Sequence, residues 1–255
     1  MTSSLPYTLD RIITIAAPRP LVFDFLRTTE RWAAWWGTGS TIDARAGGRV
    51  LIRHPNGVEM TGEVLEVDPP ARIVFTYGYA AGGAIPPGGS RVTIVLDEVE
   101  AGTRLHLTHA FADEPVRDEH VQGWRFQLSL FANAVANVQH ADSATPVDNW
   151  FAAWAETDAA ARRRALDAIA APDVRVRDRF GHLNGLDDLE PHIAAAQRFM
   201  PGLRLERRGE PRQCQGVVLA DWAAVGPDGA ERGRGTNVFT FGPDGRIAAV
   251  TGIWT

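Results

Sequence analysis

The chain has 255 residues, a net charge of -5 at pH 7 and a pI of about 5.8. All 26 basic residues are arginine. Chemistry that needs a lysine is therefore excluded: a side-chain Schiff base, a pyridoxal phosphate anchor and a phosphate-binding loop of the GxxxxGKS or GxxxxGKT type. The acidic balance, without a basic stripe interleaved with aromatic residues, argues against nucleic acid as a partner.

The single cysteine, Cys214, excludes an intramolecular disulfide and a cysteine-rich metal site. Because Cys214 falls in an apparent strand, we expect its thiol to be buried and unreactive. The first ten residues lack a basic region followed by an apolar run, and no segment reaches the roughly 20 apolar residues that span a bilayer. We therefore expect a cytoplasmic protein that does not enter a membrane.

The first half of the chain predicts a meander of strands. A strand is expected at residues 11–16, and Pro18 and Pro20 then suit the opening turn of a helix. Further strands are expected at about 49–54, 58–67, 72–79, 91–98 and 103–109, where alternating apolar residues are interrupted by glycine and proline. The most informative run is GEVLEVDPPARIVFTYGY at 62–79, in which Pro69 and Pro70 separate two strands. The glycine-rich run at 82–89 is expected to be a mobile loop at the mouth of a cavity.

A long helix is expected from Pro115 onward, because apolar residues there recur three and four positions apart. Its apolar stripe consists of Val121, Trp124, Leu128, Phe131, Val135 and Val138. The strand meander is the only large partner for this stripe. We therefore expect a curved sheet wrapped around the helix, with a cavity between them.

A polar stretch that ends in proline, residues 140–146, predicts a linker between two domains at 1–139 and 147–255. The second domain should begin with a helix pair in which Asp158 is an N-cap. Residues 162–164, all arginine, are expected to form a solvated face. A strand at 174–180, a helix at about 186–199 and three further strands follow, two of them joined by GPDG turns at 226–229 and 242–245.

The first half resembles a known family at several runs: APRPLVFDFL at 17–26, Trp35-Trp36, RAGGRV at 45–50, GEVLEVDPPARIVFTY at 62–77, LTHAF at 107–111 and HVQGW at 120–124. These runs are similar to bacterial homologues of the heat-shock ATPase activator, within the START-like helix-grip (SRPBCC) superfamily. The resemblance covers most of residues 8–139. It implies an antiparallel curved sheet around a long C-terminal helix, a fold that serves binders, transporters, cyclases and hydrolases.

The second half resembles the nuclear transport factor 2-like superfamily, which includes ketosteroid isomerase and SnoaL-like polyketide cyclases. The matching runs are VRVRDRFGHLNG at 174–185, GTNVFTFGPDGRI at 235–247 and VTGIW at 250–254. The resemblance covers roughly residues 147–255 and implies a cone-shaped α+β barrel. The fold class is therefore α+β in both halves, and both resemblances imply a small-molecule pocket. Domains of the second type often pair through the outer sheet face, so the resemblance also implies a possible homodimer.

Asp178 is the first candidate catalytic residue. It continues the strand face of Val174 and Val176, and a carboxylate on an apolar face can act as a general base because desolvation raises its proton affinity. By resemblance it takes the position of the catalytic base of ketosteroid isomerase. The alternative is an Asp at a strand end that accepts backbone hydrogen bonds from the turn at 180–182 or pairs with an arginine. Both interpretations remain open.

The rest of the isomerase site differs in this chain. The resemblance places Trp150 where the family has an oxyanion-binding tyrosine, and Asn237 where it has a protonated aspartate. Asn237 shares a strand face with Phe239 and Phe241. An asparagine amide or an indole N–H can still donate a hydrogen bond to a developing oxyanion.

A metal site is not expected, although His54, His106 and His109 all lie in predicted strands. His106 and His109 are three positions apart on one strand and therefore face opposite sides. No HExxH pattern occurs. Histidines that are hydrogen-bonded in the core or exposed to solvent explain this pattern better than a metal site does. No cofactor is expected.

Aromatic residues supply the candidate ligand-binding set, because they are suited to recognising an apolar or aromatic molecule. Core packing alone explains at least half of them. The residues selected, two histidines included, are Trp36, His54, Tyr77, Trp124, Trp150, His182 and Trp222.

Three functional hypotheses follow. The first is binding of a small, largely apolar organic molecule in the cavities of two α+β domains. The second is a cyclase- or isomerase-like enzyme in which Asp178 removes a proton next to a carbonyl group. The third is a chaperone-associated interaction module, which ranks lowest because no part of the chain resembles the N-terminal domain of the heat-shock ATPase activator.

Overall fold

The computed structural model describes residues 4–255, which form two compact units divided between Ala136 and Asn137. Each unit has its own hydrophobic core, and neither core contains residues of the other unit. Within the described residues, no helix is long and apolar enough to cross a membrane.

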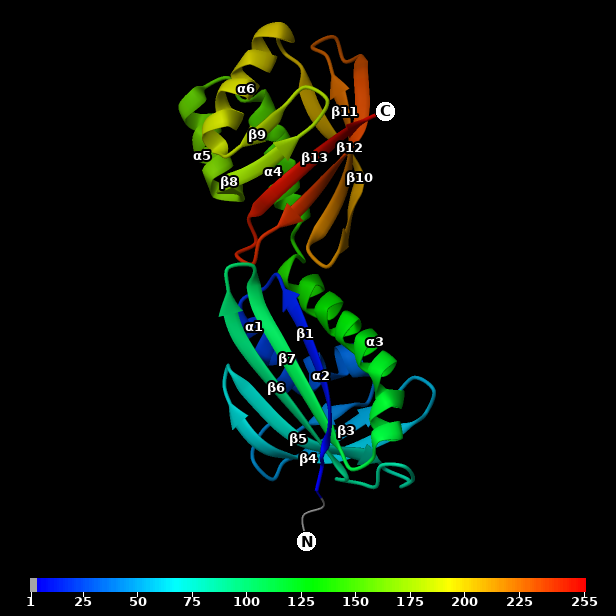
Figure 1. Cartoon of the computed structure of the whole chain (residues 1–255). Helices are drawn as coiled ribbons and strands as arrows, with labels where there is room; N and C mark the ends of the chain where they lie inside the picture. Colours follow the sequence, from blue (N-terminus) through cyan, green and yellow to red (C-terminus); the bar gives the residue numbers. More distant parts are fainter. Residues whose placement is uncertain (1–3) are drawn as a thin grey trace. The chain divides into compact units, whose positions relative to one another are not determined.

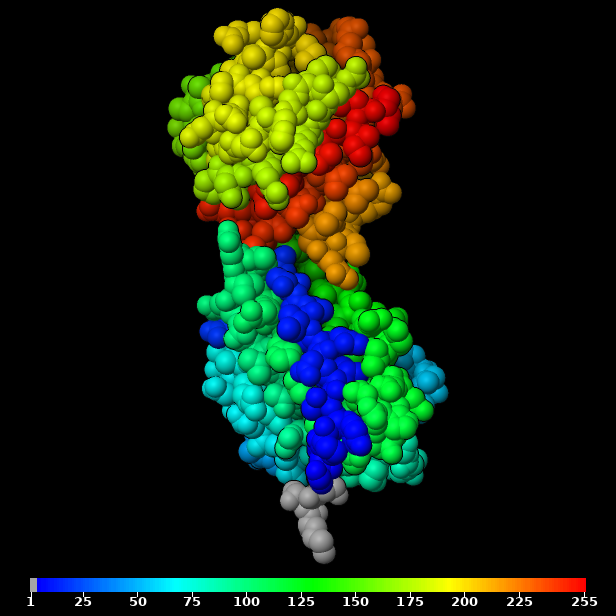
Figure 2. Space-filling view, in the orientation of Figure 1, coloured from blue at the N-terminus to red at the C-terminus, as the bar shows by residue number. Residues whose placement is uncertain are grey.

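The first unit is a seven-stranded antiparallel sheet with three helices (Figure 1). The strands are β1 (Tyr7–Ile15), β2 (Thr41–Ile42), β3 (Arg49–Arg53), β4 (Glu59–Asp68), β5 (Arg72–Tyr79), β6 (Ser90–Val99) and β7 (Gly102–Phe111). Their order in the sheet is β1-β7-β6-β5-β4-β3-β2. The helices are α1 (Arg19–Arg27), α2 (Thr29–Trp36) and α3 (Glu114–Gln139). As an edge strand, β1 is visible along the surface of this unit (Figure 2).

The apolar stripe of α3 packs into the first core, as the helical spacing predicts. Leu128, Phe131 and Val135 are buried, and the Phe131 ring contacts the rings of Phe25 and Trp35 edge-on, with centroids 6.1 and 4.9 Å away. Val138, which the sequence placed in the same stripe, is 45% exposed. The predicted helix-grip arrangement of the first half is therefore confirmed.

A chain of hydrogen bonds ties α3 to the sheet through His109, whose side chain is fully buried. The indole N–H of Trp124 donates to Nδ1 of His109 over 2.9 Å. Nε2 of His109 therefore carries the proton and donates to the hydroxyl of Ser90 over 2.8 Å, and Ser90 donates to the carbonyl of Tyr77 over 2.7 Å. Burial and the neighbouring His120 hold the pKa of His109 well below its usual range, so the ring is neutral at pH 7.

The second unit packs three helices against a six-stranded sheet of order β10-β11-β12-β13-β8-β9. The helices are α4 (Ala144–Ala155), α5 (Ala159–Ile169) and α6 (Leu186–Phe199). The strands are β8 (Ala170–Arg177), β9 (His182–Asn184), β10 (Arg204–Cys214), β11 (Val217–Val225), β12 (Glu231–Phe241) and β13 (Ile247–Trp254). β13 pairs with β8 in parallel, and the other neighbours are antiparallel. The sheet is open, so the cone is not a closed barrel.

Three local expectations are wrong. Cys214 is exposed, because the chain turns at Gln215 and Gly216, both with positive φ, and splits the expected strand into β10 and β11. Residues 144–146 belong to α4 rather than to a linker, and His140 is 5% exposed with its ring 5.4 Å from that of Phe241. Arg162 is buried rather than solvated.

Leu128→Ala should destabilise the protein by about 2–5 kcal/mol, because it leaves a cavity at a fully packed position of α3. Urea unfolding of the purified variant measures this change. Leu130→Ala is the matched control, because Leu130 lies on the same helix but is 39% exposed. Equal effects of the two substitutions would contradict the packing described for α3.

Stability should fall as the pH is lowered through 6.5, with His109 contributing up to about 1.4 kcal/mol per pH unit. The unfolded chain takes up a proton on this histidine below 6.5, whereas the folded protein holds the ring neutral. Urea unfolding at pH 7, 6 and 5 tests this. His109→Gln should reduce the pH dependence of the free energy of unfolding; an unchanged slope in His109→Gln would refute the assignment.

We propose that residues 1–139 and 140–255 are independent domains. Each fragment, produced separately, should unfold cooperatively, because each contains one complete core. Circular dichroism during heating provides the measurement. A fragment that is unfolded by itself would show that the two units stabilise one another.

Candidate functional site

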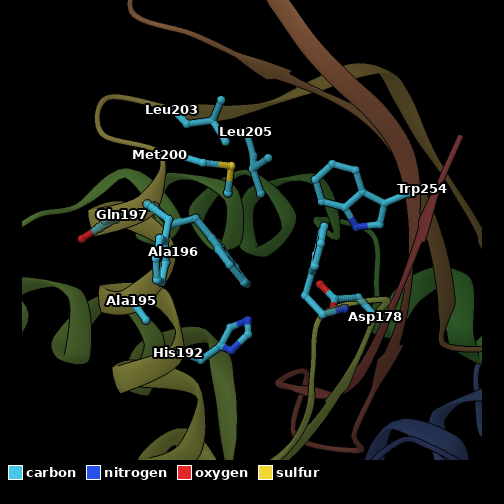
Figure 3. Close-up of a pocket in the computed structure, with 12 residues that line it drawn as sticks. Asp178, His192, Ala195, Ala196, Gln197, Met200, Leu203, Leu205 and Trp254 are labelled. Atoms are coloured by element: carbon cyan, nitrogen blue, oxygen red, sulfur yellow. Dashed lines mark hydrogen bonds between the residues drawn. The ribbon is translucent and has the colours of Figure 1, made fainter.

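The second unit contains a largely apolar pocket of about 480 Å³. Its apolar lining consists of Trp154, Phe180, Ala195, Ala196, Phe199, Met200, Leu203, Leu205 and Trp254. The polar lining residues are Asp178, His192 and Gln197. Figure 3 shows Met200, Leu203 and Leu205 gathered at one end, with Asp178 and His192 entering from different walls. A molecule that fills this space would be apolar over most of its surface, with polar groups toward Asp178 and His192.

Asp178 follows the last residue of β8, and the turn after it fixes the orientation of its carboxylate. The backbone N–H groups of Phe180 and Gly181 donate to Oδ1 over 2.7 and 2.8 Å. Oδ2 has no hydrogen-bond partner among residues 4–255, and the carboxylate takes part in no ion pair with those residues. The backbone hydrogen bonds that we considered as the alternative to a catalytic role are therefore present. They occupy Oδ1 of Asp178, a residue that lines the pocket, and leave Oδ2 without a partner in the described part of the chain.

Asn237 lies beside Asp178 but does not line the pocket. A side chain at Gly252 would meet Cβ of Asp178 at 3.1 Å and Oδ1 of Asn237 at 3.3 Å, so the glycine between them lets the two approach. Oδ1 of Asn237 accepts the indole N–H of Trp222 over 2.9 Å. This bond directs the amide nitrogen of Asn237 away from Trp222 and gives a physical reason for an asparagine on the aromatic face.

His192 and Trp154 are two lining residues that the sequence analysis did not select. Their rings meet edge-on with centroids 6.0 Å apart. His192 lies close to the Asp178 turn, because a side chain at Gly181 would meet its ring at 3.2 Å. A usable signal was present in the sequence: residues 192, 195, 196 and 199 have helical spacing and form one stripe of α6.

Helix α6 is held in place by a buried network centred on Arg162, which is 2% exposed. Its guanidinium donates to Glu190 over 3.1 Å, to the carbonyl of Glu156 over 2.7 Å and to Gln197 over 3.2 Å. Gln197 in turn donates to the carbonyls of Trp154 and Glu156 over 2.9 and 2.7 Å. The end of α4 and the pocket face of α6 are thereby fixed relative to each other.

Three residues selected from the sequence lie outside this pocket. Trp150 is buried in the core against Phe239, and the tryptophan one turn later, Trp154, lines the pocket instead. His182 is exposed on β9 beside Arg177. Trp222 is buried behind Trp254, with the two rings edge-on and 4.7 Å apart.

The first unit contains a separate cavity of about 290 Å³ beside α3. It brings together the four residues selected for this unit, Trp36, His54, Tyr77 and Trp124. Burial lowers the pKa of His54, whose ring contacts that of Trp36 edge-on with centroids 5.7 Å apart. The glycine-rich loop was expected at the cavity mouth, but none of residues 80–89 lines the cavity, and Ile85 of this loop is buried in the core.

His106 and His109, two of the histidines considered for a metal site, face opposite sides of β7, as the strand periodicity predicts. His106 lies on the outer face with Nε2 2.9 Å from a carboxylate oxygen of Asp10, whereas His109 is satisfied in the core by Trp124 and Ser90. Within residues 4–255, no three His, Cys, Asp or Glu side chains cluster as metal ligands would.

Comparison with known protein families gives one match in each of the two compact units. Residues 16–136 match the family of Activator of Hsp90 ATPase homolog 1-like proteins, and residues 147–250 match the SnoaL-like domain. None of the curated proteins matches the chain.

Three similar solved structures each cover about half of the chain. A SnoaL-like family protein from Agrobacterium tumefaciens is 29% identical; the match covers 46% of this chain and 98% of that chain, with a TM-score of 0.43. The Aha1 dimer from Colwellia psychrerythraea and a protein from Mesorhizobium loti are each 20% identical over 51% of this chain and 96% of theirs, with TM-scores of 0.44 and 0.46. The two family models alone assign residues 16–136 to an Activator of Hsp90 ATPase homolog 1-like domain and residues 147–250 to a SnoaL-like domain, two domain types that suggest ligand-binding or isomerase-like function.

Proposed function

We propose that this protein binds a small, largely apolar organic molecule, and that the pocket of the SnoaL-like domain is its principal binding site. The observation that carries this proposal is the composition of the pocket: an apolar lining of aromatic and aliphatic side chains with a few polar groups directed inward. That combination is typical of small-molecule sites, where apolar contact supplies affinity and polar groups set orientation. A volume of about 480 Å³ accommodates a molecule of two or three fused rings.

A second candidate function is proton transfer on the bound molecule. Asp178 supports it, because the two backbone N–H groups hold Oδ1 and leave Oδ2 for a substrate. In this reaction Oδ2 removes a proton from the carbon next to a carbonyl group, the C–H electron pair forms an enolate, and the proton returns to carbon. His192 or the indole of Trp254, which line the pocket, would then stabilise the enolate oxygen.

The probe 1-tetralone tests binding, because it is neutral, apolar and has an enolisable carbonyl group. Nuclear magnetic resonance of the tryptophan indole N–H groups distinguishes the two domains, since four tryptophans lie in each. We expect 1-tetralone to shift the indole signals of Trp154 and Trp254. If neither signal moves at millimolar probe, the pocket is not a site for such molecules.

Proton transfer is tested by exchange of the C2 hydrogens of 1-tetralone for deuterium in deuterium oxide. Asp178→Asn should slow this exchange by about 10²–10⁴-fold while the probe still binds, because the general base is lost. Asp173→Asn is the matched control, because Asp173 is exposed on the same strand, β8. If the probe binds and its hydrogens exchange at the same rate in the wild type and in Asp178→Asn, the pocket is a binding site and Asp178 is not a general base.

A further inference from the structure

The cavity of the first unit contains hydrogen-bonding groups that the protein leaves unused. The hydroxyl of Tyr77, a residue only 7% exposed, has no hydrogen-bond partner among residues 4–255. Burial also raises the pKa of Tyr77, so the hydroxyl keeps its proton and can donate at neutral pH.

Two unused acceptors lie at the same cavity. The Nδ1–H of His120 donates to the carbonyl of Val116 over 2.8 Å, so Nε2 is the ring nitrogen left for a ligand. The amide nitrogen of Gln127 donates to the carbonyl of Trp35, which leaves its side-chain oxygen without a partner among residues 4–255. Tyr77 and His120 are close neighbours, with ring centroids 6.2 Å apart and planes nearly perpendicular.

The remaining lining is aromatic or aliphatic, and within residues 4–255 it carries no acidic or arginine side chain. Trp36 and Trp124 meet edge-on with centroids 5.6 Å apart, and among the described residues that line the cavity there is no Asp, Glu or Arg. The buried ring of His109 behind Tyr77 is neutral and fully hydrogen-bonded. A charged ligand would lose its hydration here without gaining an opposite charge, so the site favours a neutral molecule.

We infer that this cavity is a second, separate binding site, which takes an uncharged aromatic alcohol whose hydroxyl accepts from Tyr77 and donates to His120 or Gln127. A phenol has this combination of one donor, one acceptor and an apolar ring. A cavity of about 290 Å³ suits a ligand with one ring. This site does not depend on the pocket of the SnoaL-like domain.

The lining of the cavity provides a way to block it without disturbing the core. Gly123 lines the cavity from α3, and a Cβ added there meets no atom within 4 Å and so points into open space. Replacing a glycine within a helix by leucine increases the helix propensity of the segment. The Gly123→Leu variant should therefore fold and occlude the cavity.

The test compares p-cresol with toluene, two probes that differ only in the hydroxyl group, by titration followed through the indole N–H signals of Trp36 and Trp124. We expect p-cresol to bind about tenfold more tightly than toluene, because it forms two hydrogen bonds to groups that otherwise lack partners. Tyr77→Phe should reduce this preference about fivefold. Tyr79→Phe, two residues along β5 and outside the cavity lining, should leave it unchanged. Gly123→Leu should weaken the binding of both probes.

Several outcomes would overturn the inference: toluene binding as tightly as p-cresol, an unchanged preference in Tyr77→Phe, or no response of Trp36 and Trp124 to either probe. Shifts confined to the four indoles of the second unit would also overturn it. The 1-tetralone experiment is read from Trp154 and Trp254, so failure of this inference is distinguishable from failure of the proposed function.

Discussion

The pocket of the SnoaL-like domain depends on the buried guanidinium of Arg162. A charge removed from water is tolerated only when its hydrogen-bonding groups are satisfied, and Arg162 meets this requirement with Glu190, Gln197 and the carbonyl of Glu156. These partners come from α6 and from the end of α4, the two elements that carry His192 and Trp154. The same bonds that satisfy the charge therefore set the distance between the walls of the pocket.

The two domains satisfy their polar groups to different degrees. In the first domain the chain from Trp124 through His109 and Ser90 to the Tyr77 carbonyl uses every hydrogen-bonding atom of the histidine, and the ring acts as a structural link between α3 and the sheet. In the second domain the Asp178 carboxylate is bonded at one oxygen only. The groups that make no hydrogen bond within the protein and line a cavity are the ones a ligand can bind.

Both cavities also depend on positions where a side chain is missing. At Gly252 an added Cβ would meet Cβ of Asp178 at 3.1 Å and Oδ1 of Asn237 at 3.3 Å, whereas at Gly123, which lines the first cavity, an added Cβ would meet no atom within 4 Å. In the first case the glycine brings two functional groups together, and in the second it keeps space empty. Neither role is visible in the local sequence, where both residues would be expected only to weaken their strand or helix.

The sequence by itself determined most of the secondary elements, the presence of two α+β domains of recognisable type and the burial of most of the α3 stripe, because these follow from periodicity and turn residues along the chain. It also selected Trp36, His54, Tyr77 and Trp124 as candidate ligand-binding residues, and the structure places these four around one cavity. Only the tertiary structure decided that Arg162 is buried, that Trp154 and His192 line the second pocket instead of Trp150 and His182, and that Asp178 is both capped and available. These outcomes depend on which residues from distant segments of the chain contact one another, and the local sequence does not specify such contacts.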